Sequence, residues 1–261
     1  MAAPRVLCLV LAERAGVAEV SRTVRSLATV VYTAWQAMIL GRGDSTMGVT
    51  PLPGRSSLIE AHAIAASSDY MAEVNRLVAG SDADYVLFVE AGDCVAPDVL
   101  IALAEHVAEH AAADLIYGDE DRLDATGIVG NAFHKPDWSP ALLLSQPYAV
   151  YPAFYRRRAL VEIGGLRAGC DTAALYDLAL RFTERAETIS HLPQVLYHRR
   201  GEFPVVAEGA GELPRRSIWG AAWLANRREA TARRRVVEAA LERRRLSAQV
   251  TLSRGTNTQT I

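Results

Sequence analysis

Cysteine is scarce in this chain of 261 residues, and long apolar segments are missing. Cys8, Cys94 and Cys170 are the only cysteines, too few and too widely spaced for a disulfide framework or a zinc-binding cluster. No apolar run reaches the roughly 18 residues of a membrane-spanning helix. The first residues lack the cleavage region of a signal peptide, and no Asn-x-Ser/Thr site occurs. These absences exclude a membrane channel and a secreted mini-protein, and they predict a cytoplasmic protein.

Lysine is nearly absent, and the charge is unevenly distributed. Lys135 is the only lysine among 28 basic residues, and the net charge is −2. Residues 215–261 hold eleven Arg and three Glu, a net charge of +8. Such an Arg-rich segment is typical of a solvated helix face, and it also suits peripheral contact with the anionic inner face of a membrane. We expect no nucleic-acid partner. Trp219 and Trp223, spaced i,i+4, suggest burial against a second subunit of a homo-oligomer.

Apolar strand patterns alternate with helical patterns along the first 200 residues. The patterns predict strands over 5–11, 35–40, 84–89, 114–117, 148–155 and 191–197, and helices over 16–30, 69–79, 97–111, 157–163 and 172–186. This alternation favours an α/β fold with a mostly parallel, Rossmann-like sheet and helices on both faces. We therefore expect a domain over 1–200, a Gly- and Pro-rich hinge over 201–214, and an Arg-rich amphipathic helical extension over 215–261.

Two acidic clusters follow predicted strands. Glu90-Ala-Gly-Asp93 comes after the strand 84–89, and Gly118-Asp-Glu-Asp121 comes after the strand 114–117. In open α/β sheets, ligands bind beyond the carboxyl ends of the strands. Carboxylates there can hold a Mg²⁺ or Mn²⁺ that neutralises a diphosphate. Ordinary turn chemistry also favours Gly and Asp after strands, so both interpretations stay open at this point.

A run of linked motifs resembles the family 2 glycosyltransferases, which have the GT-A fold. The segment 85–98, Tyr-Val-Leu-Phe-Val-Glu-Ala-Gly-Asp-Cys-Val-Ala-Pro-Asp, is similar to the central strand and acidic turn of that family. Further similar segments, in the same order and spacing, are 114–121, 133–140 (Phe-His-Lys-Pro-Asp-Trp-Ser-Pro), 142–146, 155–157, 163–167, 176–181 and 192–199. Residues 233–250 look like the helix and strand that follow such a domain in larger bacterial surface-polysaccharide or O-antigen transferases.

The resemblance implies inverting transfer of a sugar from a nucleotide-diphosphate donor to an acceptor hydroxyl of a glycan or small molecule. A carboxylate acts as general base, and a metal or cationic groups stabilise the departing diphosphate. The implied site has three groups: metal ligands Glu90 and Asp93, donor-binding Asp44, Asn75, Glu90, Asp93 and His198, and substrate-binding Asp119, Asp121, Lys135 and Trp138. Lys135 can pair with phosphate and Trp138 can stack on a sugar ring, or both can tie their loop down.

The sequence departs from the family pattern in the metal-binding motif and at the position of the general base. The family's Asp-x-Asp metal motif is Glu90-Ala-Gly92 here, so the need for a divalent metal is in doubt. The position of the family's general base is Leu175, which cannot take a proton. Asp171 and Asp177 are the substitute bases, although helix capping and the helix dipole also explain them. The alternative is a catalytically inactive pseudo-glycosyltransferase that acts as a partner subunit or sugar-binding module.

Overall fold

The computed structural model describes residues 3–43, 58–124, 126–201, 227–252 and 259–260 of the chain. Three sequence predictions lie outside these residues: donor binding by Asp44, nearly all of the hinge over 201–214, and burial of Trp219 and Trp223 against a second subunit.

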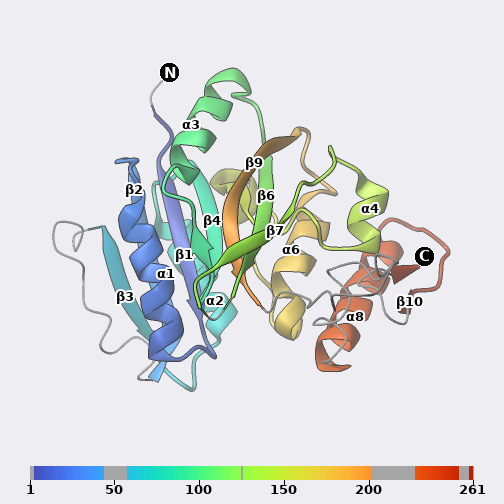
Figure 1. Cartoon of the computed structure of the whole chain (residues 1–261). Helices are drawn as coiled ribbons and strands as arrows, with labels where there is room; N and C mark the ends of the chain where they lie inside the picture. The colour runs from blue at the N-terminus through green and yellow to red at the C-terminus, as the bar shows by residue number, and fades with distance from the viewer. Residues whose placement is uncertain (1–2, 44–57, 125, 202–226, 253–258, 261) are drawn as a thin grey trace, which may run out of the picture.

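A nine-stranded sheet crosses the molecule (Figure 1). Its strands lie in the order β3-β2-β1-β4-β8-β6-β9-β5, with β7 paired to β6. β1 pairs in parallel with β2 and β4, and β6 pairs in parallel with β9, whereas β8 is antiparallel between β4 and β6. The mostly parallel sheet confirms the predicted fold class. The strands are β1 (Val6–Ala12), β2 (Trp35–Arg42), β3 (Ile59–Ile64), β4 (Tyr85–Glu90), β5 (Cys94–Val95), β6 (Leu115–Leu123), β7 (Val129–Phe133), β8 (Ala153–Arg156) and β9 (Ile189–Arg200).

Helices cover both faces of this sheet, as predicted. The apolar residues of α1 (Val17–Thr29) and α3 (Val99–Glu109) share one buried cluster with β1, β2 and β4. The other face is covered by α2 (Tyr70–Gly80), α4 (Pro140–Ser145), α5 (Arg157–Glu162), α6 (Ala174–Phe182) and α8 (Arg227–Arg243). Local chemistry sets the helix starts: the carboxylate of Asp69 accepts hydrogen bonds from the amides of Met71 and Ala72, which caps α2.

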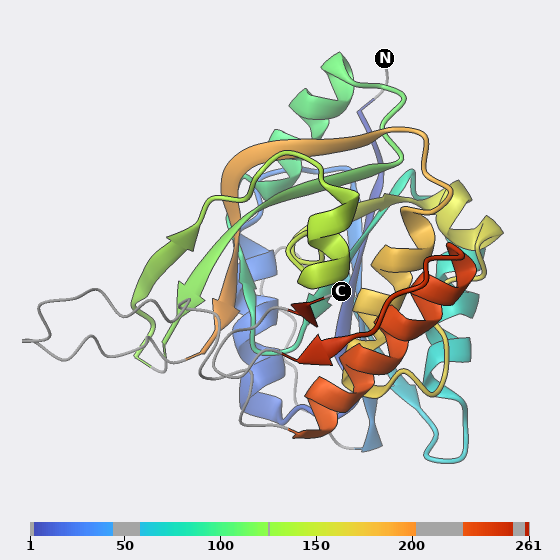
Figure 2. The same ribbon diagram turned by 90° about the vertical axis from the view of Figure 1, so that its right-hand side faces the viewer.

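The helix α8 lies beside α6, and its apolar side packs into the main core (Figure 2). Val237 and Leu241 are buried there. Arg243 and Arg244 form ion pairs with Glu184, at 2.8 and 3.3 Å. Two arginines of the Arg-rich segment therefore form ion pairs within the chain. Within the described residues, no helix combines the length and the apolar character needed to cross a bilayer.

The structure corrects three details of the sheet. Residues 118–121, predicted as a turn, continue β6 to Leu123 because they pair with β9. Residues 129–133 form β7 and Ile59–Ile64 form the edge strand β3, in two segments where the sequence predicted no strand. Strand pairing overrides local preference in these segments, since polar residues have low β-propensity on their own.

The loop over 163–166, between α5 and α6, is held by polar side chains from two helices. Asn75 of α2 donates to the carbonyl of Leu166 at 2.8 Å and accepts from its amide at 2.8 Å. Arg181 of α6 donates to the carbonyl of Gly165 at 2.6 Å and is paired with Asp177 at 2.7 Å. This clamp fixes the start of α6, where the implied base position lies.

We expect Gly165→Ala to destabilise the protein more than Gly164→Ala. Both glycines have positive φ, +64° and +84°, so both variants incur left-handed strain of about 1–2 kcal/mol. A Cβ at Gly165 would also overlap the Oδ1 of Asn75, whereas a Cβ at Gly164 meets nothing within 4 Å. Displacing Asn75 adds about 1–3 kcal/mol for unpaired backbone groups. Equilibrium urea denaturation of both variants measures the difference, and equal losses would contradict the clamp.

Candidate functional site

Glu90 and Asp93 lie at the carboxyl end of β4, where the chain turns into β5. Asp93 is buried, 3% exposed, and both of its carboxylate oxygens accept hydrogen bonds. The hydroxyl of Tyr197 donates to Oδ2 at 2.9 Å, and the amide of Arg200 donates to Oδ1 at 2.9 Å. The Oε1 of Glu90 accepts from the hydroxyl of Tyr151 at 3.0 Å. The acidic turn is therefore tied to β9 and to the segment before β8.

Glu120 of β6 joins the same region through two cations. Its Oε2 lies 3.2 Å from the Nζ of Lys135, and its Oε1 lies 3.6 Å from the Nη1 of Arg199. The guanidinium of Arg199 also stacks on the ring of Tyr151, 4.7 Å from the centroid. We call this set of contacting residues the charge cluster: Glu90, Asp93, Glu120, Lys135, Tyr151, Tyr197 and Arg199.

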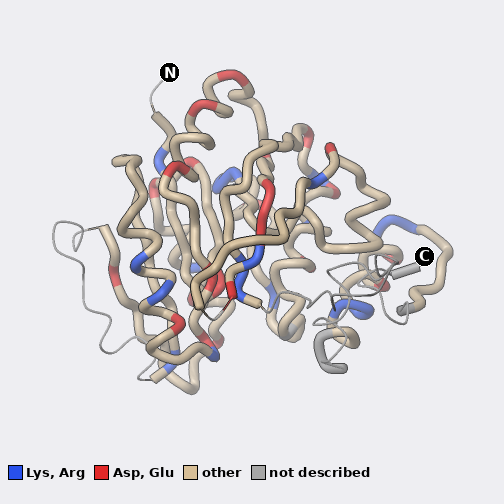
Figure 3. The backbone as a smooth tube through the Cα atoms, viewed as in Figure 1, with Lys and Arg blue, Asp and Glu red and all other residues tan. Residues whose placement is uncertain are grey.

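Asp119 and Asp121, predicted to bind substrate, lie outside the charge cluster and pair with histidines. Asp119 accepts from His191 at 2.8 Å and from His134 at 3.1 Å, and Asp121 lies 2.6 Å from the Nδ1 of His198. Side chains alternate along a strand, so His198 points away from the face on which Tyr197 reaches Asp93. Figure 3 shows the acidic stretch of β6 running into a basic one. Asp119 also accepts from the backbone amide of Lys135 at 3.0 Å, so its carboxylate adjoins the charge cluster while its side-chain partners are histidines.

Burial sets the protonation of the charge cluster. It raises the pKa of Glu90 to about 7, and the nearby Asp93 carboxylate adds to this effect. Burial likewise raises the pKa of Asp93 to about 6, against the opposing pull of Arg199. Burial lowers the pKa of Lys135, and the neighbouring Glu120 carboxylate opposes this shift. A cluster of this kind holds protons on carboxyl groups near neutral pH, which is typical of functional sites.

The residues present do not fit the divalent cation that the resemblance implies. Both oxygens of Asp93 already accept hydrogen bonds. Gly92 has a φ of +103°, and a Cβ there would lie 2.7 Å from the Cδ of Arg200, so no carboxylate can replace it without displacing that arginine. Among the described residues, no three His, Cys, Asp or Glu side chains gather where a metal ion would bind. Hard cations need several oxygen ligands converging on one point.

The remaining predicted residues have other partners. Lys135 is paired with Glu120 and the carbonyl of Tyr151. Trp138 stacks on Tyr148, with ring centroids 6.3 Å apart. Lys135 and Trp138 therefore anchor the loop that carries them. Asn75 and Asp177 are the clamp residues described above: Asn75 bonds to Leu166 and Asp177 pairs with Arg181. Asp171 lies in the 3₁₀ turn Asp171–Ala173 that precedes α6.

Sequence reasoning missed Glu120, Tyr151, Tyr197 and Arg199 as members of the site. The available signal was the alternation of β9, which continues past Tyr197 to Arg200. Extending the predicted strand 191–197 to Arg200 would have placed Tyr197 and Arg199 on one face. Tyr151 had no such signal, because it reaches Glu90 from a segment outside the regular elements.

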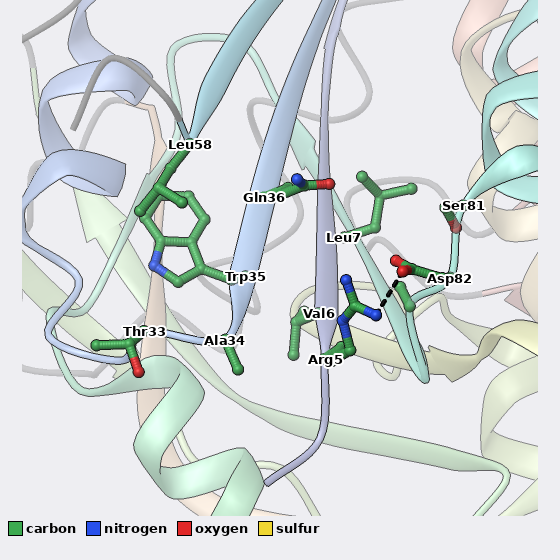
Figure 4. Close-up of a pocket in the computed structure, with 11 residues that line it drawn as sticks. Arg5, Val6, Leu7, Thr33, Ala34, Trp35, Gln36, Leu58, Ser81 and Asp82 are labelled. Atoms are coloured by element: carbon green, nitrogen blue, oxygen red, sulfur yellow. Dashed lines mark ion pairs between the residues drawn. The ribbon is translucent and has the colours of Figure 1, made fainter.

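A cavity of about 210 Å³ opens at the amino ends of β1 and β2, away from the charge cluster (Figure 4). Arg5, Trp35, Gln36 and Asp82 are among its lining residues, and Arg5 is ion-paired with Asp82 across it. Ligands of open α/β sheets bind at the opposite, carboxyl ends of the strands. The charge cluster is therefore the stronger candidate site.

We expect the wild-type free energy of unfolding to fall from pH 5 to pH 8 more steeply than that of Glu90→Gln. The folded pKa of Glu90 is about 7 against an ordinary value of 4.5, so the folded state binds more protons and loses stability as the pH rises. Gln cannot ionise, and the variant should gain roughly 1–3 kcal/mol on wild type by pH 8. Urea denaturation in EDTA measures this. The exposed Glu162→Gln should follow wild type, and parallel curves for Glu90→Gln would contradict the assignment.

Comparison with known proteins gives one relative named for O-antigen biosynthesis and one uncharacterized protein. No protein-family model matches the chain. The O-antigen biosynthesis protein RfbC of Myxococcus xanthus is 33% identical over 191 residues, covering 71% of this chain and 15% of the relative. The uncharacterized protein y4gI of Sinorhizobium fredii is 32% identical over 118 residues, covering 44% of this chain and 13% of that protein. This chain thus corresponds to about one-seventh of the length of these relatives.

Solved structures share the fold at low sequence identity. TarS of S. aureus (residues 1–349) in complex with UDP has a TM-score of 0.63 and 11% identity, covering 91% of this chain and 65% of that one. The mannosyltransferase PcManGT of Pyrobaculum calidifontis, in complex with GDP-Man and Mn²⁺, has a TM-score of 0.52 and 13% identity, covering 79% and 59%. These matches confirm the predicted resemblance: the chain has the fold of glycosyltransferases and resembles a protein of bacterial surface-polysaccharide biosynthesis.

Proposed function

We propose that this chain is a family 2, inverting glycosyltransferase. It transfers a sugar from a nucleotide-diphosphate sugar to a hydroxyl of a glycan or small-molecule acceptor, in the synthesis of a surface polysaccharide or a glycosylated metabolite. One observation supports this most strongly. A buried cluster of carboxyl, phenol and guanidinium groups lies at the carboxyl ends of β4 and β6, where sheets of this kind bind ligands. The similarity to a protein of O-antigen biosynthesis and the fold shared with a mannosyltransferase support the proposal.

In this reaction the acceptor oxygen bonds to the anomeric carbon while the bond from that carbon to the donor diphosphate breaks. The acceptor proton passes to a general base, and the nucleoside diphosphate leaves with the bonding electrons. The protein must therefore stabilise negative charge that develops on the diphosphate. The preorganised cations of the charge cluster, fixed by Glu120 and Tyr151, suit that task.

Asp171 is the better of the two predicted bases. The carboxylate of Asp177 is 3% exposed and held by Arg181, so it cannot reach an acceptor without breaking a buried ion pair, which is costly. Leu175, at the implied base position, is itself buried. Asp171 lies immediately before α6, close in sequence to that position.

We expect Asp171→Asn to lower kcat by about 10²- to 10⁴-fold with little change in stability, because a general base contributes that much to the rate. Asp177→Asn should instead lower stability, since it leaves Arg181 buried and unpaired. Single-turnover kinetics and urea denaturation of both variants separate the two roles. Thr172→Ala, in the same 3₁₀ turn, serves as the control. Full activity in Asp171→Asn would rule out this base.

A catalytically inactive protein with the same fold is the second candidate, because Leu175 and the Asp177–Arg181 pair leave the usual base position without a proton acceptor. Such a protein would act as a partner subunit or a sugar-binding module. Such a protein would not turn over the donor, whereas the enzyme would.

Calorimetry against UDP, GDP and dTDP, followed by a donor-turnover assay with the matching nucleotide sugars, tests the proposal. For an enzyme we expect micromolar to millimolar binding of at least one nucleotide, and release of the nucleoside diphosphate from its sugar ester. Binding without turnover on any acceptor hydroxyl, water included, would favour the inactive form. No binding of any nucleotide would overturn the proposed donor site.

A further inference from the structure

Arginine occupies the space in which the glycosyltransferase pattern places a second metal-binding carboxylate. At Gly92 a Cβ would lie 2.7 Å from the Cδ and 3.1 Å from the Nη1 of Arg200. Arg200 is held there from two sides: its amide donates to Asp93, and its guanidinium pairs with Glu19 of α1. A positive group therefore stands where a metal ligand would be expected.

Arg199, the preceding residue, has a donor that no protein group uses. Its Nε–H is buried and has no hydrogen-bond partner among the residues that the structure describes. Glu120 and the ring of Tyr151 fix the guanidinium on other sides. An unused buried donor costs about 1–3 kcal/mol, and an anionic oxygen would satisfy it.

Positive charge is concentrated at the ends of these two strands. Arg122 of β6 is in register with Arg199 of β9. Burial and, to a smaller extent, the neighbouring charge of Arg199 lower the pKa of Arg122 to about 10. Two arginines held side by side repel each other, and a bound diphosphate would relieve that repulsion. Guanidinium groups bind phosphate oxygens in a fixed, bidentate geometry.

We propose that this chain binds the diphosphate of its nucleotide donor without a divalent cation, through the guanidinium groups of Arg199 and Arg200, which leave opposite faces of β9 and flank the turn at 90–93. The proposal rests on the proposed function and adds the charge that stabilises the leaving group. The carboxylates of the charge cluster then orient cations and tyrosines and do not ligate a metal.

Calorimetry in EDTA tests this with UDP, GDP and dTDP and with their nucleosides. We expect wild type to bind one diphosphate in EDTA, with less than about a threefold change in Kd when Mn²⁺ replaces EDTA. Arg199→Gln and Arg200→Gln should each weaken diphosphate binding by about 10- to 100-fold, as for a lost charge-assisted contact, and leave nucleoside binding unchanged. The exposed Arg158→Gln is the matched control. Arg200, whose side chain is 48% exposed, gives a variant that folds even where Arg199→Gln does not.

The outcomes separate the two proposals. Diphosphate binding that requires Mn²⁺ leaves the proposed function standing and overturns this inference. Binding in EDTA that is unchanged in both folded arginine variants overturns the role of Arg199 and Arg200. Failure of every nucleotide to bind, with or without Mn²⁺, overturns the proposed donor site itself.

Discussion

The carboxylate of Asp93 joins two parts of the sheet that are distant in sequence. It belongs to the turn after β4, yet both of its oxygens accept hydrogen bonds from β9, one from the Tyr197 hydroxyl and one from the Arg200 amide. Losing one partner of a buried carboxylate costs more than the bond itself contributes, because the charge is left without solvent. The geometry of the turn and of the end of β9 is therefore set together. Arg199, which lies between these two donors in sequence, is positioned as a consequence.

The same constraint explains why the turn has a glycine in its middle. Gly92 has a φ of +103°, and its amide donates to the Thr23 hydroxyl of α1 at 2.8 Å. A side chain at this position would be strained and would meet Arg200. The glycine at position 92 and the arginine at position 200 are thus one structural feature. A positive side chain from another strand fills the space beside the turn.

The sequence predicted the central strands and most helices well, because their apolar residues follow simple periods. Val20, Val24 and Leu27 of α1 and the continuous apolar run of β4 are examples. It predicted β6 too short, since Asp119, Glu120 and Asp121 are poor strand formers that pair only because β9 is beside them. Of the charge cluster, the sequence prediction named Glu90, Asp93 and Lys135 and missed the other four members. Glu90 and Asp93 were found from their place after a strand, whereas Tyr151 and Arg199 join them through contacts across 61 and more residues of sequence.

Burial of so many polar groups needs a reason, because each desolvated charge opposes folding. In the charge cluster, Lys135 is fully buried against Glu120, and Glu90 has a pKa near 7. Apolar residues of similar size would pack at lower cost in such a place. The cost is understandable if the groups must be fixed before a ligand arrives, since dipoles and charges that are already oriented need no rearrangement when negative charge develops. The clamp of Asn75 and Arg181 follows the same logic: polar side chains fix a loop that precedes the helix carrying the implied base position.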